Sequence, residues 1–207
     1  MTVSGTRSTL ARAADPASSL LGERLPRGFY ARPTLRVARD LLGKILVLQG
    51  SGATKAARIV EVEAYLGGRD PASHAYRGLT PRTAPMFGPP GRSYVYFVYG
   101  MYYCLNVVTE RDGIAGAVLL RGAEPLAGWD GLAARALAGP GKLARAFGLT
   151  TKHTDLDLVR SGLSIRDALP VPPSRVARSV RVGLNQHATT SKRWRLFVRG
   201  SSGVSRF

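Results

Sequence analysis

The sequence predicts an α+β fold: one compact domain around a curved antiparallel or mixed β-sheet, with helices at its flanks. Strand-like segments fill the middle of the chain, helical segments flank them, and few strands alternate with helices as a doubly wound fold requires. A length of 207 residues fits one domain with a sizeable core. A hydrophobic content of 44%, with 8% aromatic residues, is typical of a folded protein.

Residues 1–25 are predicted to be a flexible, basic N-terminal arm, which leaves residues 26–207 as the folded domain. The arm is rich in arginine, serine and alanine and lacks the apolar core of a secretory signal, so a targeting role and a DNA-contacting role both stay open. An amphipathic helix follows, because Pro33 suits a first helical turn and Gly43 suits an end. Its apolar face carries Leu35, Ala38, Leu41 and Leu42.

Two strands are predicted next, at 44–50 and 56–67. In the second strand Glu61 and Glu63 alternate with apolar neighbours, so both carboxylates point to the same side. Residues 68–92 then form a long stretch that is rich in proline and glycine. A loop of that length inside a compact domain is typical either of a functional segment or of missed secondary structure.

The segment 93–108, "SYVYFVYGMYYCLNVV", is predicted to form a hairpin and holds five of the eight tyrosines of the chain. Gly100 supplies the turn, because a positive φ costs glycine little. Tyr99 then stands at the tip, where its ring has no core to enter. A ring that protrudes from a very basic protein suits a wedge between DNA bases. Tyr94 and Tyr103 are expected to pack across the two strands.

The C-terminal half is predicted to add one long strand, one helix and three short strands. The long strand covers 116–126, and a helix around 129–138 leads into "PGKLARAFGL" at 140–149. The closing strands are expected near 162–167, 179–184 and 194–199.

The charge of the chain indicates a nucleic-acid partner. The chain carries 30 lysine and arginine residues against 13 acidic residues, which gives a net charge of +17 and a pI near 11.1. Most of the basic residues are arginine, whose planar guanidinium fits phosphate oxygens in pairs. No apolar run of about 18 residues is present to span a membrane. The single cysteine, Cys104, excludes an internal disulfide, and we therefore expect an intracellular protein.

Glu61 and Glu63, with Asp70 and His74 downstream, allow three interpretations. Their residue types suit a metal site, although neither a second nearby histidine nor an HExxH spacing supports one. They also suit solvated charges on a strand. In the third interpretation one of them is a catalytic carboxylate, which Arg121 on a neighbouring strand keeps ionised. Since this central region contains no lysine for a Schiff base, a carboxylate that activates water is the simpler chemistry.

A series of motifs runs through the chain in order: "RIVEVEAYLGGRDPASHAYRG", "TPR", "MFGPPG", "YVYFVYGMYYCLNVV", "AVLLRGAEPL", "GPGKL", "RVGL" and "LFVRGSS". In order and spacing they resemble the alkyladenine (3-methyladenine) DNA glycosylase family, over about residues 25–202. The resemblance implies a single-domain α+β fold with a protruding, DNA-intercalating hairpin. It also implies a monofunctional enzyme, without lyase activity, that flips a damaged purine out of duplex DNA and hydrolyses its N-glycosidic bond to leave an abasic site.

The substrates that this resemblance implies are alkylated and deaminated purines of the 3-methyladenine, 7-methylguanine, hypoxanthine and ethenoadenine class. The implied partner is double-stranded DNA that contains such a base, in base excision repair. A monomer is expected, inside the cell with the DNA, in the cytoplasm or nucleoid if the source is bacterial. No membrane, metal or cofactor is implied.

Matching positions assign the implied catalytic roles. Glu63 of "EAY" matches the general base that activates the attacking water. Arg121 of "LLRG" and the backbone of Val182 in "RVG" match the groups that hold this water. Arg121 is also expected to keep Glu63 ionised by lowering the pKa of its carboxyl group.

The base pocket and the DNA-facing surface are implied in the same way. Tyr65 and Tyr96 match rings that stack on the purine, and His74 matches the residue that reads its edge. Asn106 matches the residue that crowds the exocyclic amine of normal guanine, and Tyr99 matches the intercalating wedge. Further DNA contacts are implied for Met101, Tyr102, Thr80, Met86, Arg82 and Lys142.

Two other classes of function stay open. A basic architectural or RNA-binding protein would explain the charge equally well, but it would not need acidic and polar residues in register with the aromatic ones. A metal hydrolase would use Glu61, Glu63 and His74. The sequence departs from the family at Gly203, where a tryptophan is usual, and this difference concerns the C-terminal edge and not the active site.

Overall fold

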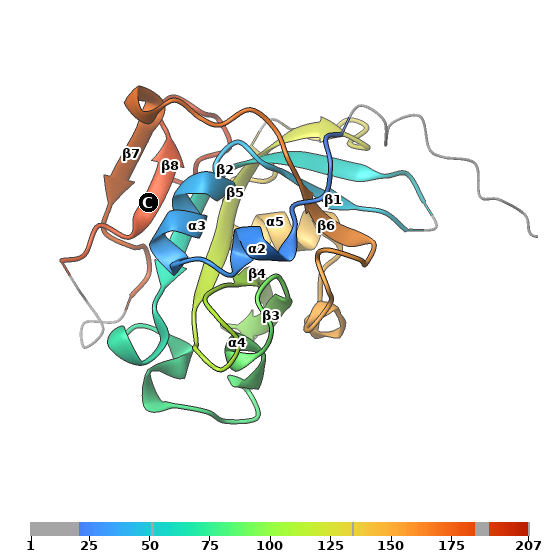
Figure 1. Cartoon of the computed structure of the whole chain (residues 1–207). Helices are drawn as coiled ribbons and strands as arrows, with labels where there is room; N and C mark the ends of the chain where they lie inside the picture. Colours follow the sequence, from blue (N-terminus) through green and yellow to red (C-terminus); the bar gives the residue numbers. More distant parts are fainter. Residues whose placement is uncertain (1–20, 51, 134, 185–190, 207) are drawn as a thin grey trace, which may run out of the picture.

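The computed structural model describes residues 21–50, 52–133, 135–184 and 191–206. They form a curled antiparallel sheet with few helices, which confirms the predicted α+β class (Figure 1). The helices are α2 (Arg27–Tyr30), α3 (Thr34–Leu41), α4 (Ala84–Phe87) and α5 (Pro140–Phe147), with 3-10 turns η1 (Gly67–Arg69), η2 (His74–Arg77), η3 (Thr151–His153) and η4 (Pro173–Arg175). The strands are β1 (Ile45–Leu48), β2 (Lys55–Tyr65), β3 (Ser93–Val98), β4 (Tyr102–Val108), β5 (Ala117–Ala127), β6 (Leu163–Arg166), β7 (Val176–Ser179) and β8 (Arg195–Val198).

The sheet is organised around the long strands β2 and β5, which pair with each other (Figure 1). Its main path runs β3-β4-β5-β2-β1-β6, and β8 joins β2 and carries β7. The second edge of β2 is shared, since β1 pairs with its first residues and β8 pairs with Glu61 to Glu63. The middle of β2 therefore has a strand on each side, which buries its polar residues together with its apolar ones.

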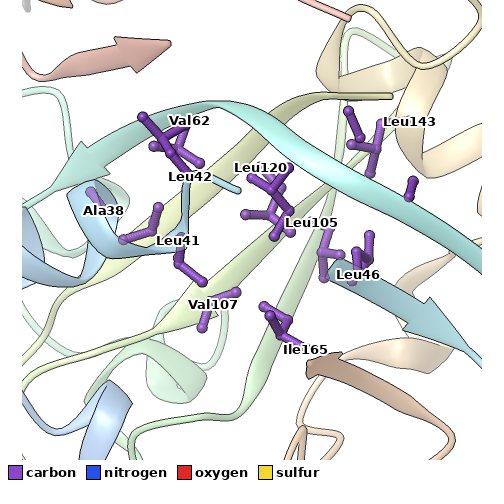
Figure 2. Close-up of a cluster of buried hydrophobic side chains, with 14 of the residues drawn as sticks. Ala38, Leu41, Leu42, Leu46, Val62, Leu105, Val107, Leu120, Leu143 and Ile165 are labelled. Carbon is purple, nitrogen blue, oxygen red and sulfur yellow. The ribbon is translucent and has the colours of Figure 1, made fainter. Parts of the chain in front are cut away.

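The hydrophobic core lies between this sheet and two amphipathic helices, α3 and α5. Leu41 of α3 and Leu143 of α5 are fully buried against sheet residues such as Leu120 (Figure 2). α3 ends where the sequence predicts, before Gly43 with its positive φ of 90°, and α5 ends in the same way at Gly148, whose φ is 70°. Burial of these apolar faces stabilises the helices, which are too short to persist alone.

The predicted hairpin is formed by β3 and β4, which join through a tight turn at Tyr99 and Gly100. The Met101 N–H donates to the Val98 carbonyl at 3.3 Å. Gly100 has the expected positive φ of 67°, but Tyr99 also has a positive φ, of 54°. A left-handed conformation costs a non-glycine residue about 1–2 kcal/mol. Tyr99 is therefore held in a strained backbone conformation by the surrounding turn.

The predicted helix around 129–138 is wrong, since the described residues of this segment form turns. Gly128 and Gly131 have positive φ angles of 74° and 66°, which interrupt a right-handed helix. The Trp129 indole N–H donates to the Ala56 carbonyl at 2.6 Å, and this bond ties the segment to β2. The apolar pattern that suggests a helix serves instead to pack an irregular segment on the sheet.

The predicted strand at 179–184 is displaced, because β7 occupies Val176–Ser179 and ends there. Beyond it the chain turns inward: Arg181 pairs with Asp70, and Gly183 has a positive φ of 71°. These contacts replace the ladder bonds that a continued strand would make. The residues after β7 therefore form a loop that reaches β2.

The predicted N-terminal arm extends too far into the domain. Leu21 and Leu25 are buried, and the Leu25 N–H donates to the Ile165 carbonyl at 2.9 Å. Apolar burial and a backbone hydrogen bond hold this segment on the sheet, so residues 21–25 belong to the folded domain. The rest of the predicted arm, residues 1–20, lies outside the described residues.

The long segment 68–92 contains local structure, namely η2 and α4. Short turns of this kind carry no long hydrophobic period, so sequence patterns miss them. Across the part of the chain that the structure describes, no helix has the length and apolar content needed to cross a membrane.

Candidate active site

A cavity of about 490 Å³ opens between the β3–β4 hairpin, the end of β2 and the loop after β7. Six of the residues with predicted roles in catalysis and base binding line it, and these are Tyr65, His74, Tyr96, Asn106, Arg121 and Val182. Tyr99 also lines the cavity. Since these residues come from β2, η2, β3, β4, β5 and the loop after β7, the fold brings the predicted catalytic and base-binding residues to one place.

Glu63 is fully buried next to this cavity. Its Oε1 accepts a hydrogen bond from the Val182 N–H at 2.8 Å and lies 3.4 Å from Arg121 Nη1. Its Oε2 accepts from the Tyr65 hydroxyl at 2.8 Å. The interpretation of this residue as a solvated surface charge is therefore wrong. The carboxylate is held in one orientation by partners on three sides.

Burial raises the pKa of Glu63 above its ordinary value and outweighs the opposing effects of the Arg121 charge, the Val182 N–H and the Tyr65 hydroxyl. The Arg121 charge lowers this pKa as predicted, but the larger effect of burial leaves the net pKa raised. Arg121 is also shared, because its Nε donates to Glu61 at 3.0 Å while its Nη1 lies 3.4 Å from Glu63. A carboxylate with a raised pKa is a stronger base when ionised.

Three aromatic side chains meet at the cavity rim. The rings of His74 and Tyr96 lie edge to face, with centroids 4.5 Å apart. His74 Nδ1 is 3.1 Å from the Tyr94 hydroxyl. Partial burial against these rings, with the nearby Arg82 charge, lowers the pKa of His74, so its ring is neutral at pH 7. Tyr94 therefore does more than pack across the hairpin, whereas Tyr103 packs on Phe97 as predicted, with centroids 4.9 Å apart.

Asn106 is buried on β4, and its Nδ2 donates to the Tyr94 carbonyl at 3.0 Å. This bond fixes the side-chain amide beside the cavity. A rigid amide at this point limits the shape of any group that enters.

The loop that supplies the Val182 N–H is anchored by a buried ion pair, which sequence reasoning missed. Arg181 donates from Nη1 and Nη2 to the two carboxylate oxygens of Asp70, at 2.6 and 2.7 Å. Both side chains are fully buried. The guanidinium of Arg181 also stacks over the Tyr65 ring, 4.5 Å from its centroid. The sequence signal that could have pointed to Arg181 is its position in the motif "RVG", directly before the predicted site residue Val182.

The outer face of the hairpin is exposed. Tyr99 is 74% exposed, Met101 64% and Tyr102 41%, unusual values for large apolar side chains. The Tyr102 ring packs over Gly141 in the first turn of α5, where an added Cβ would lie 2.8 Å from the ring. Lys142 is exposed beside this contact.

The three remaining predicted DNA contacts, Thr80, Arg82 and Met86, lie in the segment before the hairpin. Thr80 is exposed, and its hydroxyl lies 3.0 Å from that of Thr83. Arg82 is exposed, and its charge acts against the burial that raises the pKa of the Tyr94 hydroxyl. Met86, in contrast, is only 2% exposed and lines the cavity, because it belongs to a small apolar cluster. Its predicted contact with DNA could therefore be made only from inside the cavity.

No group of three histidine, cysteine or acidic side chains that could hold a metal ion occurs among the described residues. Glu61 accepts hydrogen bonds from Arg121, Arg195 and Ser205. His74 Nδ1 is 3.1 Å from the Tyr94 hydroxyl. The predicted alternative of a metal hydrolase has no set of ligands in this part of the chain.

Residues 28–202 match the family model described as methylpurine-DNA glycosylase. The chain is 48% identical over 183 residues to a protein of Myxococcus xanthus, a match that covers 88% of this chain and 93% of that protein. It is 44% identical over 192 residues to a protein of Chlorobaculum parvum, covering 88% and 91%. A protein of Methanocella arvoryzae is 44% identical over 193 residues, covering 88% and 96%. Each relative is named as a candidate 3-methyladenine DNA glycosylase.

Proposed function

This chain belongs to the methylpurine-DNA glycosylase family, and we propose that it excises alkylated and deaminated purines from double-stranded DNA in base excision repair. The observation that carries this proposal is the buried carboxylate of Glu63, held by Tyr65, Arg121 and the Val182 N–H beside an aromatic cavity. The substrates are bases of the 3-methyladenine, 7-methylguanine, hypoxanthine and ethenoadenine class. The enzyme acts inside the cell as a monomer and without a cofactor.

The reaction is hydrolysis of the bond between the purine nitrogen and C1′ of the sugar. Ionised Glu63 takes a proton from water, the water oxygen forms a bond to C1′, and the purine leaves with the bonding electrons. A carboxylate has about four acceptor positions. The Val182 N–H and the Tyr65 hydroxyl use two of these, and the Arg121 guanidinium lies 3.4 Å from Oε1, so an acceptor position remains for the water. The negative charge also stabilises the positive charge that develops on the sugar.

The aromatic residues of the cavity favour a damaged purine. An alkylated purine is often cationic, and the electron-rich rings of Tyr65 and Tyr96 attract a cation that stacks on them. Arg181 covers one face of the Tyr65 ring, which leaves the other face for the base. The fixed amide of Asn106 crowds the exocyclic amine of guanine, so normal guanine is excluded.

A base inside duplex DNA cannot reach this cavity, so the enzyme extrudes it, at a cost of a few kcal/mol. Tyr99 offsets part of this cost by filling the vacated stack, since an aromatic stacking contact contributes about 1–3 kcal/mol. Its exposure and its strained turn support this role. Met101 and Tyr102 contact the neighbouring bases, and Thr80, Arg82 and Lys142 contact the DNA around them.

The test is release of a base from a defined duplex. Duplexes with a single hypoxanthine, 7-methylguanine or ethenoadenine are incubated with the protein and then treated with hot alkali, which breaks the strand at an abasic site. Breakage at the damaged position only after alkali supports a monofunctional glycosylase. Tight binding without breakage at any of these bases would favour a basic DNA-binding or RNA-binding protein. A parallel reaction with chelator should proceed unchanged, whereas a metal hydrolase would lose activity.

A further inference from the structure

A second buried carboxylate, Glu61, lies two residues before Glu63 on the same side of β2. It is fully buried and accepts from Arg121 Nε at 3.0 Å and from Arg195 Nε at 2.6 Å. It also accepts two hydrogen bonds from Ser205, from the backbone N–H at 2.6 Å and from the hydroxyl at 2.8 Å. The proposed reaction gives this carboxylate no role, yet Oε1 accepts three of these hydrogen bonds and Oε2 accepts the fourth.

Arg121 links the two carboxylates. Its Nε donates to Glu61, and its Nη1 lies 3.4 Å from Glu63. Because a guanidinium is planar and rigid, fixing Nε on Glu61 also fixes the position of Nη1. Arg121 therefore cannot move onto Glu63 for a closer pair while Glu61 holds it.

Ser205 reaches Glu61 because the C-terminal loop lies directly on β5. A Cβ added to Gly122 would lie 2.2 Å from the Gly203 carbonyl oxygen, and one added to Gly203 would lie 2.4 Å from the Ala123 carbonyl oxygen. Neither position has room for a side chain. Ser205 in the C-terminal loop is therefore hydrogen-bonded to Glu61, which lies beside the active site. From the sequence alone, in contrast, the C-terminal edge is expected to be unconnected with the active site.

We propose that Glu61 and Ser205 are positioning residues that hold Arg121 away from full pairing with Glu63, so that Glu63 stays basic enough to take a proton from water. This inference rests on the proposed glycosylase function. Burial alone would raise the pKa of Glu61, but the Ser205 N–H and the charges of Arg121 and Arg195 lower it, so Glu61 is ionised and competes for Arg121. A carboxylate that is fully paired with arginine is a weaker base.

The pH dependence of the rate reports this competition. Neutralising Glu61 removes a nearby negative charge and frees Arg121 for Glu63, so the pKa of Glu63 should fall. The groups that act on Glu63 from all sides of the site are Arg121, Tyr65, Glu61, Tyr96, Cys104 and the Val182 N–H. In Glu61→Gln only Glu61 is substituted among these groups, so a displaced acid limb in that variant is assigned to the loss of its charge and the resulting approach of Arg121.

The test compares Glu61→Gln and Ser205→Ala with the wild type and with Ser202→Ala, a control at an exposed serine of the same loop. Single-turnover base release is measured across pH, and affinity for the lesion duplex is measured separately. Glu61→Gln should be about tenfold slower at neutral pH, with its acid limb moved to lower pH. Ser205→Ala keeps the backbone bond to Glu61, so its rate and its acid limb should shift in the same direction as those of Glu61→Gln, but by less. Ser205→Thr keeps the hydroxyl, so its rate and acid limb should match those of the wild type. The affinity for the lesion duplex should stay unchanged in all of these variants.

Different failures of this experiment have different meanings. A wild-type protein that releases no base refutes the proposed function and this inference with it. An active wild type together with variants whose rate and pH profile match it refutes the inference alone. A slower variant without a displaced acid limb, or with an equal loss of affinity, would make the network merely structural. If Glu61→Gln does not fold, Ser205→Ala with a wild-type pH profile is sufficient to reject the inference.

Discussion

The buried ion pair between Asp70 and Arg181 provides a sharp test of how the site is held. We consider Asp70→Asn, which keeps the size of the side chain but removes its charge. Both groups of the pair are fully buried, and two hydrogen bonds of 2.6 and 2.7 Å join them. The substitution leaves the Arg181 guanidinium buried without its anion, directly before the Val182 N–H that binds Glu63.

The expected loss follows from this burial. Removing one partner of a buried pair costs about 3–5 kcal/mol, because the remaining charge keeps its desolvation penalty. For a chain of 207 residues, each kcal/mol shifts Tm by about 2–4 °C. Asp70→Asn should therefore lower Tm by about 6–20 °C. Base release should also slow, because the loop that carries Val182 loses its anchor.

The assay is thermal unfolding followed by circular dichroism, with Asp40→Asn as the matched control. Asp40 pairs with Arg32 at 2.9 Å, but its side chain is 39% exposed, so its loss should cost less than about 1 kcal/mol. Equal, small shifts in Tm for the two variants would refute the reasoning that burial makes the Asp70 pair indispensable.

Three further predictions concern the base, the wedge and the C-terminal loop. Base release should fall as pH drops, with an acid limb above the ordinary glutamate range, since burial raises the pKa of Glu63 and only the ionised form accepts a proton; a rate that is flat down to pH 4 would contradict this. Tyr99→Ser should weaken capture of lesion duplex by about 5-fold to 150-fold while Tyr99→Phe binds normally, and titration of a fluorescent duplex measures both. Gly122→Ala should cost about 1–3 kcal/mol in a denaturant titration, because its Cβ would meet the Gly203 carbonyl, whereas Gly28→Ala, with open space, should change little.

Local patterns in the sequence predict the strands and the side on which the two glutamates lie. Alternation along β2 is a property of neighbouring residues, so Glu61 and Glu63 could be assigned to one side without the structure. The same reasoning fails at 129–138, where the apolar spacing of a helix is present but Gly128 and Gly131 favour turns.

The support of the site could not be predicted, because it depends on contacts between distant segments. Asp70 and Arg181 are separated by 111 positions, and Glu61 and Ser205 by 144. No local pattern reports such a pair. The resemblance to a known family identified Arg121 as a neighbour of Glu63, but only the structure shows that Glu61 shares it.

The central claim is that Glu63 acts as a base and does not merely hold the fold, and Glu63→Gln tests it most directly. The measurement pairs single-turnover release of hypoxanthine with affinity for the same duplex. We predict release at least about 100-fold slower with nearly unchanged affinity, since general base catalysis contributes about that much or more. Release within a few fold of the wild type, or an affinity that falls as far as the rate, would contradict the claim.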